Sequence, residues 1–304
     1  MKFLKISLFI MFCFSAANAQ LRPLAVETLP LERSHQWNQA QFSPDGKFIY
    51  FTTMDFNGIW EYSVESKRAR VITSDAQSGF GFAVSNNGKL ISYRRSRNDE
   101  GTKERMQELV LLDLATGAST IAASGGDVST PTFVQNDLAY TSAGKSGIPS
   151  RAASVESIIL GIENTKIAVS KNGKKVLLDP VGKGSYIWPS LSPDGKKILA
   201  YDMNKGTFLC DANGSNVFLL GRLDAPAWTR DGKWILYMDD KDDGRIITSS
   251  EIWAISPDGA QKVQLTSTDR ILEMYPSCSP TENKIVCNSL SGELYVISYT
   301  EVPR

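Results

Sequence analysis

A hairpin motif that recurs along most of the chain is the feature that most constrains its fold. Two copies are nearly identical: FSPDGKFIYF over 42–51 and LSPDGKKILA over 191–200. In both copies an apolar residue precedes a turn that contains glycine, and another apolar or aromatic residue follows nine positions after the first. The same spacing is found at 84–93, 228–237 and 278–287, and a shorter version at 133–140. A fixed repeat of this kind predicts a repeat architecture.

A second pair of apolar segments follows the hairpins, as in GIWEYSVESKRARVIT over 58–73 and EIWAISPDGAQKVQLT over 251–266. Asn-Gly and Asp-Gly between apolar segments are strong hairpin signals, because both residues accept the positive φ of such turns. Each unit is therefore predicted to contain four antiparallel strands. Six such units predict an all-β fold, a six-bladed β-propeller of four-stranded antiparallel blades. A β-sandwich, the alternative, gives no reason for six copies of one hairpin.

The last unit has only three predicted strands before the chain ends at Arg304. A missing outer strand would leave an unpaired edge, which closed architectures avoid. The segment LAVETLPL over 24–31 alternates well enough to supply that strand. We predict that this N-terminal strand pairs with the strand near 294–299 and closes the last blade.

The first 19 residues have the layout of a secretory signal peptide. Lys2 and Lys5 precede an apolar run at 6–14, and Ala17-Asn18-Ala19 forms a small-x-small cleavage site. The apolar run is too short to span a bilayer, and no other run approaches the necessary length. We predict a signal peptide at 1–19 and a single propeller over 20–304, exported to a periplasmic or extracellular location without a transmembrane segment. A buried N-terminal strand is the alternative.

Charge and cysteine content narrow the classes of partner and scaffold. Without Lys2 and Lys5 the chain has 31 basic and 33 acidic residues, a formal charge of −2, which gives no indication of nucleic acid as a partner. Three cysteines are then left, too few for a disulfide-stapled scaffold. Cys278 and Cys287 flank one predicted hairpin, but sequence does not give the Cα separation that decides whether they are bridged.

The SPDGK hairpins, together with E-I-W at 251–253 and E-L-Y at 293–295, resemble the propeller of TolB-type periplasmic proteins. The resemblance covers the predicted mature chain and implies a six-bladed propeller associated with envelope protein complexes. TolB itself carries an α/β domain before its propeller. Only about a dozen residues precede the first blade here, so we expect the propeller alone.

The predicted strand order places the repeated short turns on one face and the connections of variable length on the other. Asp45 and Asp194 of the repeated motif are therefore interpreted as turn residues, not as ligands. Three connections on the second face are long: 94–107, 142–157 and 239–250. Long loops on a rigid scaffold commonly carry binding residues, so we predict that function lies on this long-loop face.

Three groups of residues on this face are candidates for binding. Arg94, Arg95 and Arg97 offer guanidinium groups, which suit carboxylates, phosphates or an acidic protein patch, although pairing with acidic residues of the same loop is the alternative. Carboxylates near the channel mouth come from Asp239 and Asp240. Aromatic residues at the starts of innermost strands are candidates to line the mouth, with packing between blades as the alternative: Trp37, Tyr186, Trp188 and Tyr275.

The sequence offers little for metal, cofactor or triad chemistry. His35 is the only histidine and no G-x-S-x-G occurs, so we predict neither a hydrolase triad nor a histidine metal site. The acidic segment 240–251 has its glycine one position away from that of a calcium loop, and AYTSAGKS at 139–146 lacks the first glycine of a phosphate-binding loop. We therefore expect no metal and no cofactor.

These observations favour a monomeric, non-catalytic binding or scaffold propeller that holds an envelope or periplasmic protein or peptide through its long-loop face. The alternative is a carbohydrate-active or carbohydrate-binding propeller that uses acidic residues at the central mouth, because two carboxylates suffice for glycosidic chemistry. A deep polar pocket with converging acids would favour this alternative.

Overall fold

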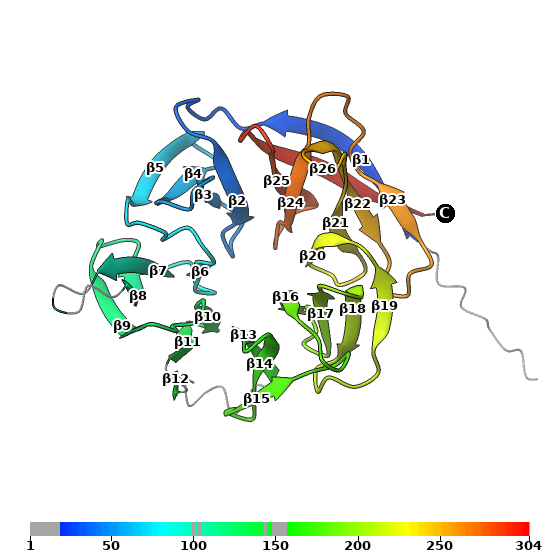
Figure 1. The fold of residues 1–304 in the computed structure, drawn as a ribbon. Helices are drawn as coiled ribbons and strands as arrows, with labels where there is room; N and C mark the ends of the chain where they lie inside the picture. Colours follow the sequence, from blue (N-terminus) through cyan, green and yellow to red (C-terminus); the bar gives the residue numbers. More distant parts are fainter. Residues whose placement is uncertain (1–18, 99–100, 102–104, 143–144, 148–156, 304) are drawn as a thin grey trace, which may run out of the picture.

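The computed structural model describes residues 19–98, 101, 105–142, 145–147 and 157–303, and within these ranges it contains strands and turns but no helix. The strands form seven antiparallel sheets arranged around a ring (Figure 1). The all-β class and the propeller ring are confirmed. The predicted signal peptide at 1–19 lies, apart from Ala19, outside the described residues. The described part of the chain has no helical stretch with the length and apolar character that a membrane span requires.

Five sheets contain four strands each, and these correspond to five of the predicted repeat units. They are β2 to β5 (Trp37–Phe42, Phe48–Thr53, Ile59–Ser63, Arg68–Thr73), β6 to β9 (Ala83–Val84, Leu90–Asn98, Arg105–Asp113, Ser119–Gly125), β16 to β19 (Tyr186–Leu191, Lys197–Asp202, Gly206–Asp211, Phe218–Gly221), β20 to β23 (Asp224–Trp228, Ile235–Asp242, Ile247–Ile255, Lys262–Gln264), and β24 to β26 (Glu273–Cys278, Lys284–Ser289, Leu294–Pro303) with β1 (Ala19–Thr28).

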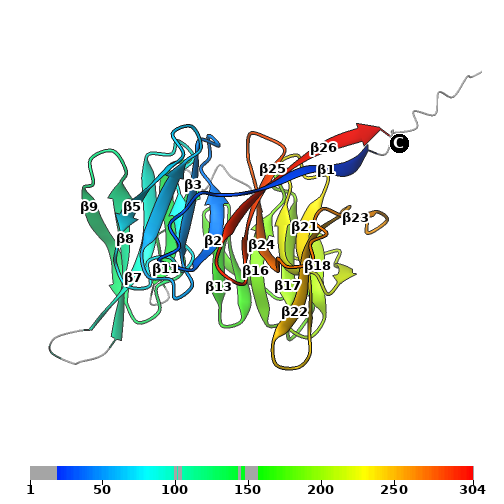
Figure 2. The same ribbon diagram turned by 90° about the horizontal axis from the view of Figure 1, so that it is seen from above.

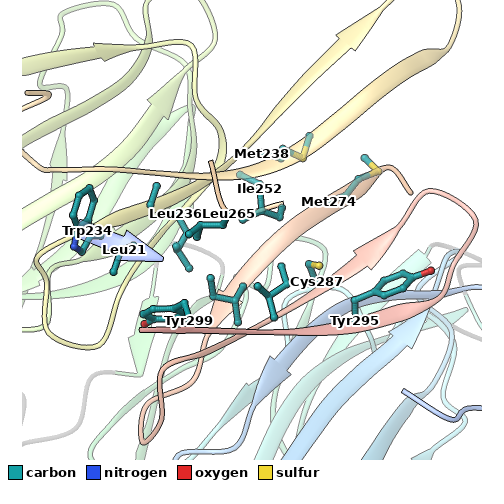
Figure 3. Packing of buried hydrophobic residues seen from close by; sticks show 14 residues of the cluster. Leu21, Trp234, Leu236, Met238, Ile252, Leu265, Met274, Cys287, Tyr295 and Tyr299 are labelled. Atoms are coloured by element: carbon teal, nitrogen blue, oxygen red, sulfur yellow. The ribbon is translucent and has the colours of Figure 1, made fainter. Parts of the chain in front are cut away.

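The predicted closure of the ring by an N-terminal strand is confirmed. β1 pairs antiparallel with β26, with Val26 opposite Ile297, and the two strands run side by side in Figure 2. The strand begins at Ala19, five residues before the predicted start. Leu21 is buried and belongs to a core cluster that also contains Trp234 of the neighbouring sheet, so closure joins two sheets through side chains as well as hydrogen bonds (Figure 3).

The third predicted unit needs a correction. Residues 132–178 do not form one four-stranded blade but two three-stranded sheets, β10 to β12 (Thr132–Val134, Asp137–Ser142, Lys145–Gly147) and β13 to β15 (Ser157–Glu163, Lys166–Lys171, Lys174–Leu178). The sequence interpretation took 142–157 as a loop and gave no strand to 157–163. β13 nevertheless pairs with β14, and Ile158 and Leu160 pack with Val134 and Ala139 of the adjacent sheet. The ring therefore has one sheet more than the six repeat units predict.

β13 also runs in the opposite direction to its neighbour β16. The backbone N–H of Tyr186, the first residue of β16, donates to Thr165 O in the turn after β13 at 3.1 Å. The Lys166 ammonium donates to Gly184 O in the link before β16 at 2.9 Å. The end of β13 therefore lies beside the start of β16, which a regular repeat would not produce.

The repeated Asp-Gly motif serves backbone geometry. The Ser43 hydroxyl donates to Asp45 Oδ1 at 2.6 Å, and the same carboxylate accepts from the Lys47 N–H at 3.1 Å. Gly46 takes the positive φ (72°) that the turn requires. Ser192, Asp194 and Lys196 repeat the arrangement with matching distances. The interpretation of Asp45 and Asp194 as turn residues is confirmed.

The open question of a disulfide is also answered. Cys210, Cys278 and Cys287 are free thiols, so Cys278 and Cys287 are not bridged. Cys287 faces the core shared with the adjacent sheet, and the Cys278 thiol lies 3.7 Å from the Tyr299 hydroxyl. The predicted hairpin exists, and both residues pack against the same core cluster without being bridged.

Candidate functional site in the central channel

A cavity of about 1220 Å³ lies along the inner ends of the sheets from β6 to β16. Its position follows from strand length. The innermost strands β6 and β10 contain two and three residues, whereas β2, β16 and β24 contain six. The short inner strands leave the strands behind them partly uncovered, so that Arg94 of β7 and Gln107 of β8 reach the channel. The wall includes Gln39, Phe80, Arg94, Gln107, Trp188 and Ser190.

Arg94 reaches this cavity from β7. Its Nη1 donates to Val128 O at 2.8 Å and to Gln107 Oε1 at 3.3 Å, and its Cζ lies 5.4 Å from the centroid of the Phe80 ring. Burial lowers the pKa of the guanidinium. The Nε atom is buried and has no hydrogen-bond partner. Arg94 is thus a fixed, largely desolvated cation at the wall of the cavity.

The predicted cluster of three arginines is divided by the alternation of side chains along the strand. Arg95 Nε donates to Glu108 Oε2 at 2.8 Å, and its Nη1 lies 3.3 Å from Asp75 Oδ2. Arg97 lies 3.6 Å from the other oxygen of Glu108. Arg95 and Arg97 are therefore paired with carboxylates, the alternative that the sequence left open, and do not line the cavity.

Two of the three predicted long loops are largely extended hairpins. β7 and β8 are paired as far as Asn98 and Arg105, and β21 and β22 as far as Asp242 and Ile247. The predicted loops 94–107 and 239–250 are therefore corrected to strands over 94–98, 105–107, 239–242 and 247–250, and residues 99–100 and 102–104 lie outside the described residues. In the third, 142–157, residues 145–147 form β12, and most of the rest lies outside the described residues.

Two of the four predicted aromatic residues are packing residues. Trp37 is buried, donates through Nε1 to Glu32 O at 3.1 Å and packs on Phe51 with ring centroids 5.0 Å apart. Tyr186 is buried, and its hydroxyl donates to Asp179 Oδ1 at 2.7 Å. The Tyr186 side chain packs on Phe208 and serves the core between β14 and β17.

The other two aromatic residues, Trp188 and Tyr275, lie at a kink that recurs on the innermost strands. Both have positive φ, 51° and 54°, at β-bulges where β16 and β24 lose register with their neighbours. Gln39 and Ala225 occupy the matching bulges of β2 and β20 with φ of 46° and 48°. Left-handed backbone at bulky residues is uncommon and concentrates at functional sites. Trp188 is 36% exposed and lines the cavity.

Asp224 of β20 and Asp240 of β21 form a pair of neighbouring carboxylates. Asp239 is exposed, whereas Asp240 is partly buried and its Oδ1 has no hydrogen-bond partner. Asp224, the first residue of β20, was not predicted. Burial and the nearby charge of Asp240 raise its pKa, and Arg222 opposes that shift. Burial and the charges of Asp240 and Asp224 likewise raise the pKa of Tyr275, which places Tyr275 beside the pair.

Trp188 links the carboxylate pair to the cavity. Its ring lies 5.6 Å from that of Tyr201, whose hydroxyl accepts a hydrogen bond from Arg222 Nε at 3.4 Å. Arg94 therefore lies in the cavity wall, which also includes Asp127 and Glu163, whereas Asp224 and Asp240 lie outside that wall, on the sheet that follows Trp188 and Tyr201. Asp224 shares one structural feature with residues of other innermost strands. It directly precedes the residue with positive φ on its strand, as Asn38 and Met274 do on theirs.

His35 lies away from these groups. Its ring packs 5.0 Å from Trp37 and 5.7 Å from Trp60, and its Nδ1 lies 2.9 Å from the Ser34 hydroxyl. Within the ranges that the structure covers, no three His, Cys, Asp or Glu side chains are grouped in a way that could hold a metal ion.

No family model matches the sequence, and no curated protein matches it. Among solved structures the chain is similar to TolB from Acinetobacter baumannii, with 19% identity and a TM-score of 0.54 over 77% of this chain and 55% of that TolB, so it spans about half of its length. A putative TolB from Agrobacterium tumefaciens matches with 16% identity and a TM-score of 0.53, over 91% of this chain and 97% of that protein. An oligogalacturonate lyase in complex with manganese matches with 14% identity and a TM-score of 0.50, over 87% and 78%. The chain thus has a TolB-like propeller fold, and at these identities the likeness shows the fold alone.

Proposed function

We propose that this chain is an exported binding propeller that holds a peptide segment of an envelope or periplasmic partner protein in its central cavity. The observation that carries the proposal is the composition of the cavity wall. Apolar side chains such as Phe80 and Ile187 alternate there with a buried cation, Arg94, and with amide and hydroxyl groups. A mixed wall of this kind suits a peptide, which presents apolar side chains and polar backbone together.

The size of the cavity agrees with a ligand larger than a metabolite. Its volume of about 1220 Å³ exceeds the range of roughly 300–1,000 Å³ that is usual for small-molecule sites. The exposed Trp188 offers the rigid aromatic surface that often anchors a partner segment. The TolB-like fold supports a protein partner by analogy only.

Export is part of the proposal and rests on the first 19 residues of the sequence. Cleavage after Ala19 would leave Gln20 as the first residue, and β1 would lose only its terminal position. The closing strand and its buried Leu21 would be retained. Processing at the predicted site is therefore compatible with a closed ring.

Crosslinking and affinity capture from the native envelope test the proposal. The wild-type protein is compared with Trp188→Ala and with Phe218→Ala, in which an exposed aromatic residue is removed from the outer strand β19, away from the cavity. We expect one or more envelope proteins to be captured by the wild type and by Phe218→Ala, and at least tenfold less by Trp188→Ala. Equal capture by all three proteins, or no specific capture by the wild type, would contradict the proposal.

A second candidate function is a carbohydrate-active or carbohydrate-binding propeller. The observation in its favour is the Asp224 and Asp240 pair, because burial and the charge of Asp240 raise the pKa of Asp224, and glycosidic acid–base chemistry uses two neighbouring carboxyl groups. Trp188 would provide a face for a sugar ring. Incubation with a panel of neutral and acidic polysaccharides tests it: release of reducing ends that is lost in Asp224→Asn would support this candidate, and absence of release would count against an enzyme.

A further inference from the structure

Arg94 differs from the arginines around it in having no carboxylate partner. Arg70 is paired with Glu61, and Arg95 and Arg97 with Glu108. In the described part of the chain no acidic side chain lies within ion-pair distance of Arg94, although its guanidinium is more desolvated than theirs. Burying a cation without a counter-ion is costly, and most buried charges are paired. The missing partner at the wall of a large cavity points to a ligand.

The guanidinium of Arg94 is held through one terminal nitrogen, and its other terminal nitrogen has no partner among the described residues. Nη1 is held by Val128 O and Gln107 Oε1, and the Phe80 ring packs against the group. Nε is buried and has no hydrogen-bond partner, and Nη2 donates to no described residue. Nη2 is therefore the guanidinium nitrogen that is left to donate to a ligand in the cavity, and a charge-assisted hydrogen bond to a carboxylate oxygen is a strong contact for it.

We infer that Arg94 binds a carboxylate group of the ligand. This carboxylate belongs to a peptide and has an apolar side chain next to it. The peptide part of the inference rests on the proposed function, whereas the carboxylate part rests on Arg94 alone. One cation with one unpaired donor nitrogen matches a monoanion such as a carboxylate. A phosphate dianion would call for further cations or backbone donors, and none of the cavity residues around Arg94 is a second lysine or arginine.

The surroundings of Arg94 favour a peptide over an acidic sugar. Phe80, which is 48% exposed, and the partly buried Ile187 and Phe133 contribute to the same wall. An apolar side chain next to the carboxylate would cover these surfaces, as at a peptide C-terminus that ends in an aliphatic residue. A uronic acid has no apolar side chain beside its carboxylate, so it would leave these apolar surfaces uncovered.

The test compares N-acetyl-leucine, a carboxylate with an apolar side chain, with N-acetyl-leucinamide, its neutral counterpart. Binding to the purified protein is followed by NMR, with the Arg94 Nε–H signal assigned through its loss in Arg94→Lys. We expect the acid to bind at least tenfold more tightly than the amide and to shift the Arg94 signal. The preference for the acid should fall to about one in Arg94→Gln, should be reduced in Arg94→Lys, and should be unchanged in Arg97→Gln.

The ratio of acid to amide affinity within each protein is insensitive to partial loss of fold, and the wild-type comparison needs no substitution. Equal binding of the two compounds, binding of neither, or a preference that persists in Arg94→Gln would overturn the inference. Galacturonate is titrated in parallel, and Arg94-dependent binding of galacturonate without binding of N-acetyl-leucine would overturn the peptide assignment. If the protein shows no preference for the acid over the amide but still captures a partner in a Trp188-dependent way, only this inference is refuted. If it clearly prefers the acid but captures no envelope partner, only the proposed function is refuted.

Discussion

Replacing Leu21 by Ala is expected to weaken the closure of the ring. Leu21 is 2% exposed, although most of β1 lies at the outer edge of its sheet. Its side chain belongs to the cluster that contains Trp234, Leu236 and Tyr299, so it joins the last sheet to the one before it (Figure 3). The substitution removes this contact and leaves the backbone pairing with β26 in place.

The size of the effect follows from burial. Leu→Ala at a fully buried site costs about 2–5 kcal/mol. Because β1 is an outer strand whose surroundings can relax, we expect the lower part of this range, about 2.5 kcal/mol. A chain of roughly 285 residues has an unfolding entropy of about 0.6 kcal/mol per kelvin, so the Tm should fall by about 4 °C.

Thermal unfolding of the protein that begins at Gln20, followed by calorimetry, measures the change. Leu24→Ala is the matched control, since Leu24 lies on the same strand but is 62% exposed. We expect the control to lower the Tm by less than about 1 °C. Equal shifts for the two variants, or a shift below 1 °C for Leu21→Ala, would refute the view that Leu21 fastens the closing strand.

Two further predictions concern buried titratable groups. Burial, together with the charge of Glu251, raises the pKa of Glu273 to about 7 from 4.5. The folded state therefore holds this proton more tightly than the unfolded state, and stability should decline as pH rises from about 4.5 to about 7. Glu273→Gln should abolish that part of the decline, whereas Glu293→Gln should retain it; parallel pH profiles of the melting temperature for wild type and Glu273→Gln would contradict this. Burial also raises the pKa of Cys210 to about 12, and Cys287 is fully buried. Neither thiol should react with DTNB until the protein unfolds, and reductant should leave the Tm unchanged; a disulfide found by mass spectrometry would contradict the free thiols.

Features set by local chemistry were predictable from the sequence. The geometry of the SPDGK turns is determined by residues within the motif. The Ser43 hydroxyl and the Asp45 carboxylate form hydrogen bonds within the turn, and Gly46 takes the positive φ. The closing strand was predictable for a different reason, the cost of an unpaired edge. Its early start was not, because Gln20 to Pro23 pair with an extension of β26 that no alternating pattern marks.

The extended hairpins were missed because their pattern is polar. Arg95 to Asn98 and Arg105 to Gln107 form strands that project from the sheet, so neither face needs an apolar series. The carboxylate pair was missed in part for a related reason. Asp240 was predicted as a loop residue, whereas its environment depends on Asp224, which comes from another strand and has no motif around it.

The cavity lies where the repeat is least regular, and this follows from how a propeller is built. A blade with a full innermost strand fills the channel wall with that strand and hides the strand behind it. β6 and β10 are too short to do so, and β13 replaces a regular innermost strand by one of opposite direction. Arg94 can reach the channel because β6 begins only at Ala83, opposite Ser92, and leaves the following part of β7 uncovered. A sequence search for the best copies of the motif therefore locates the scaffold, and the weakest copies locate the site.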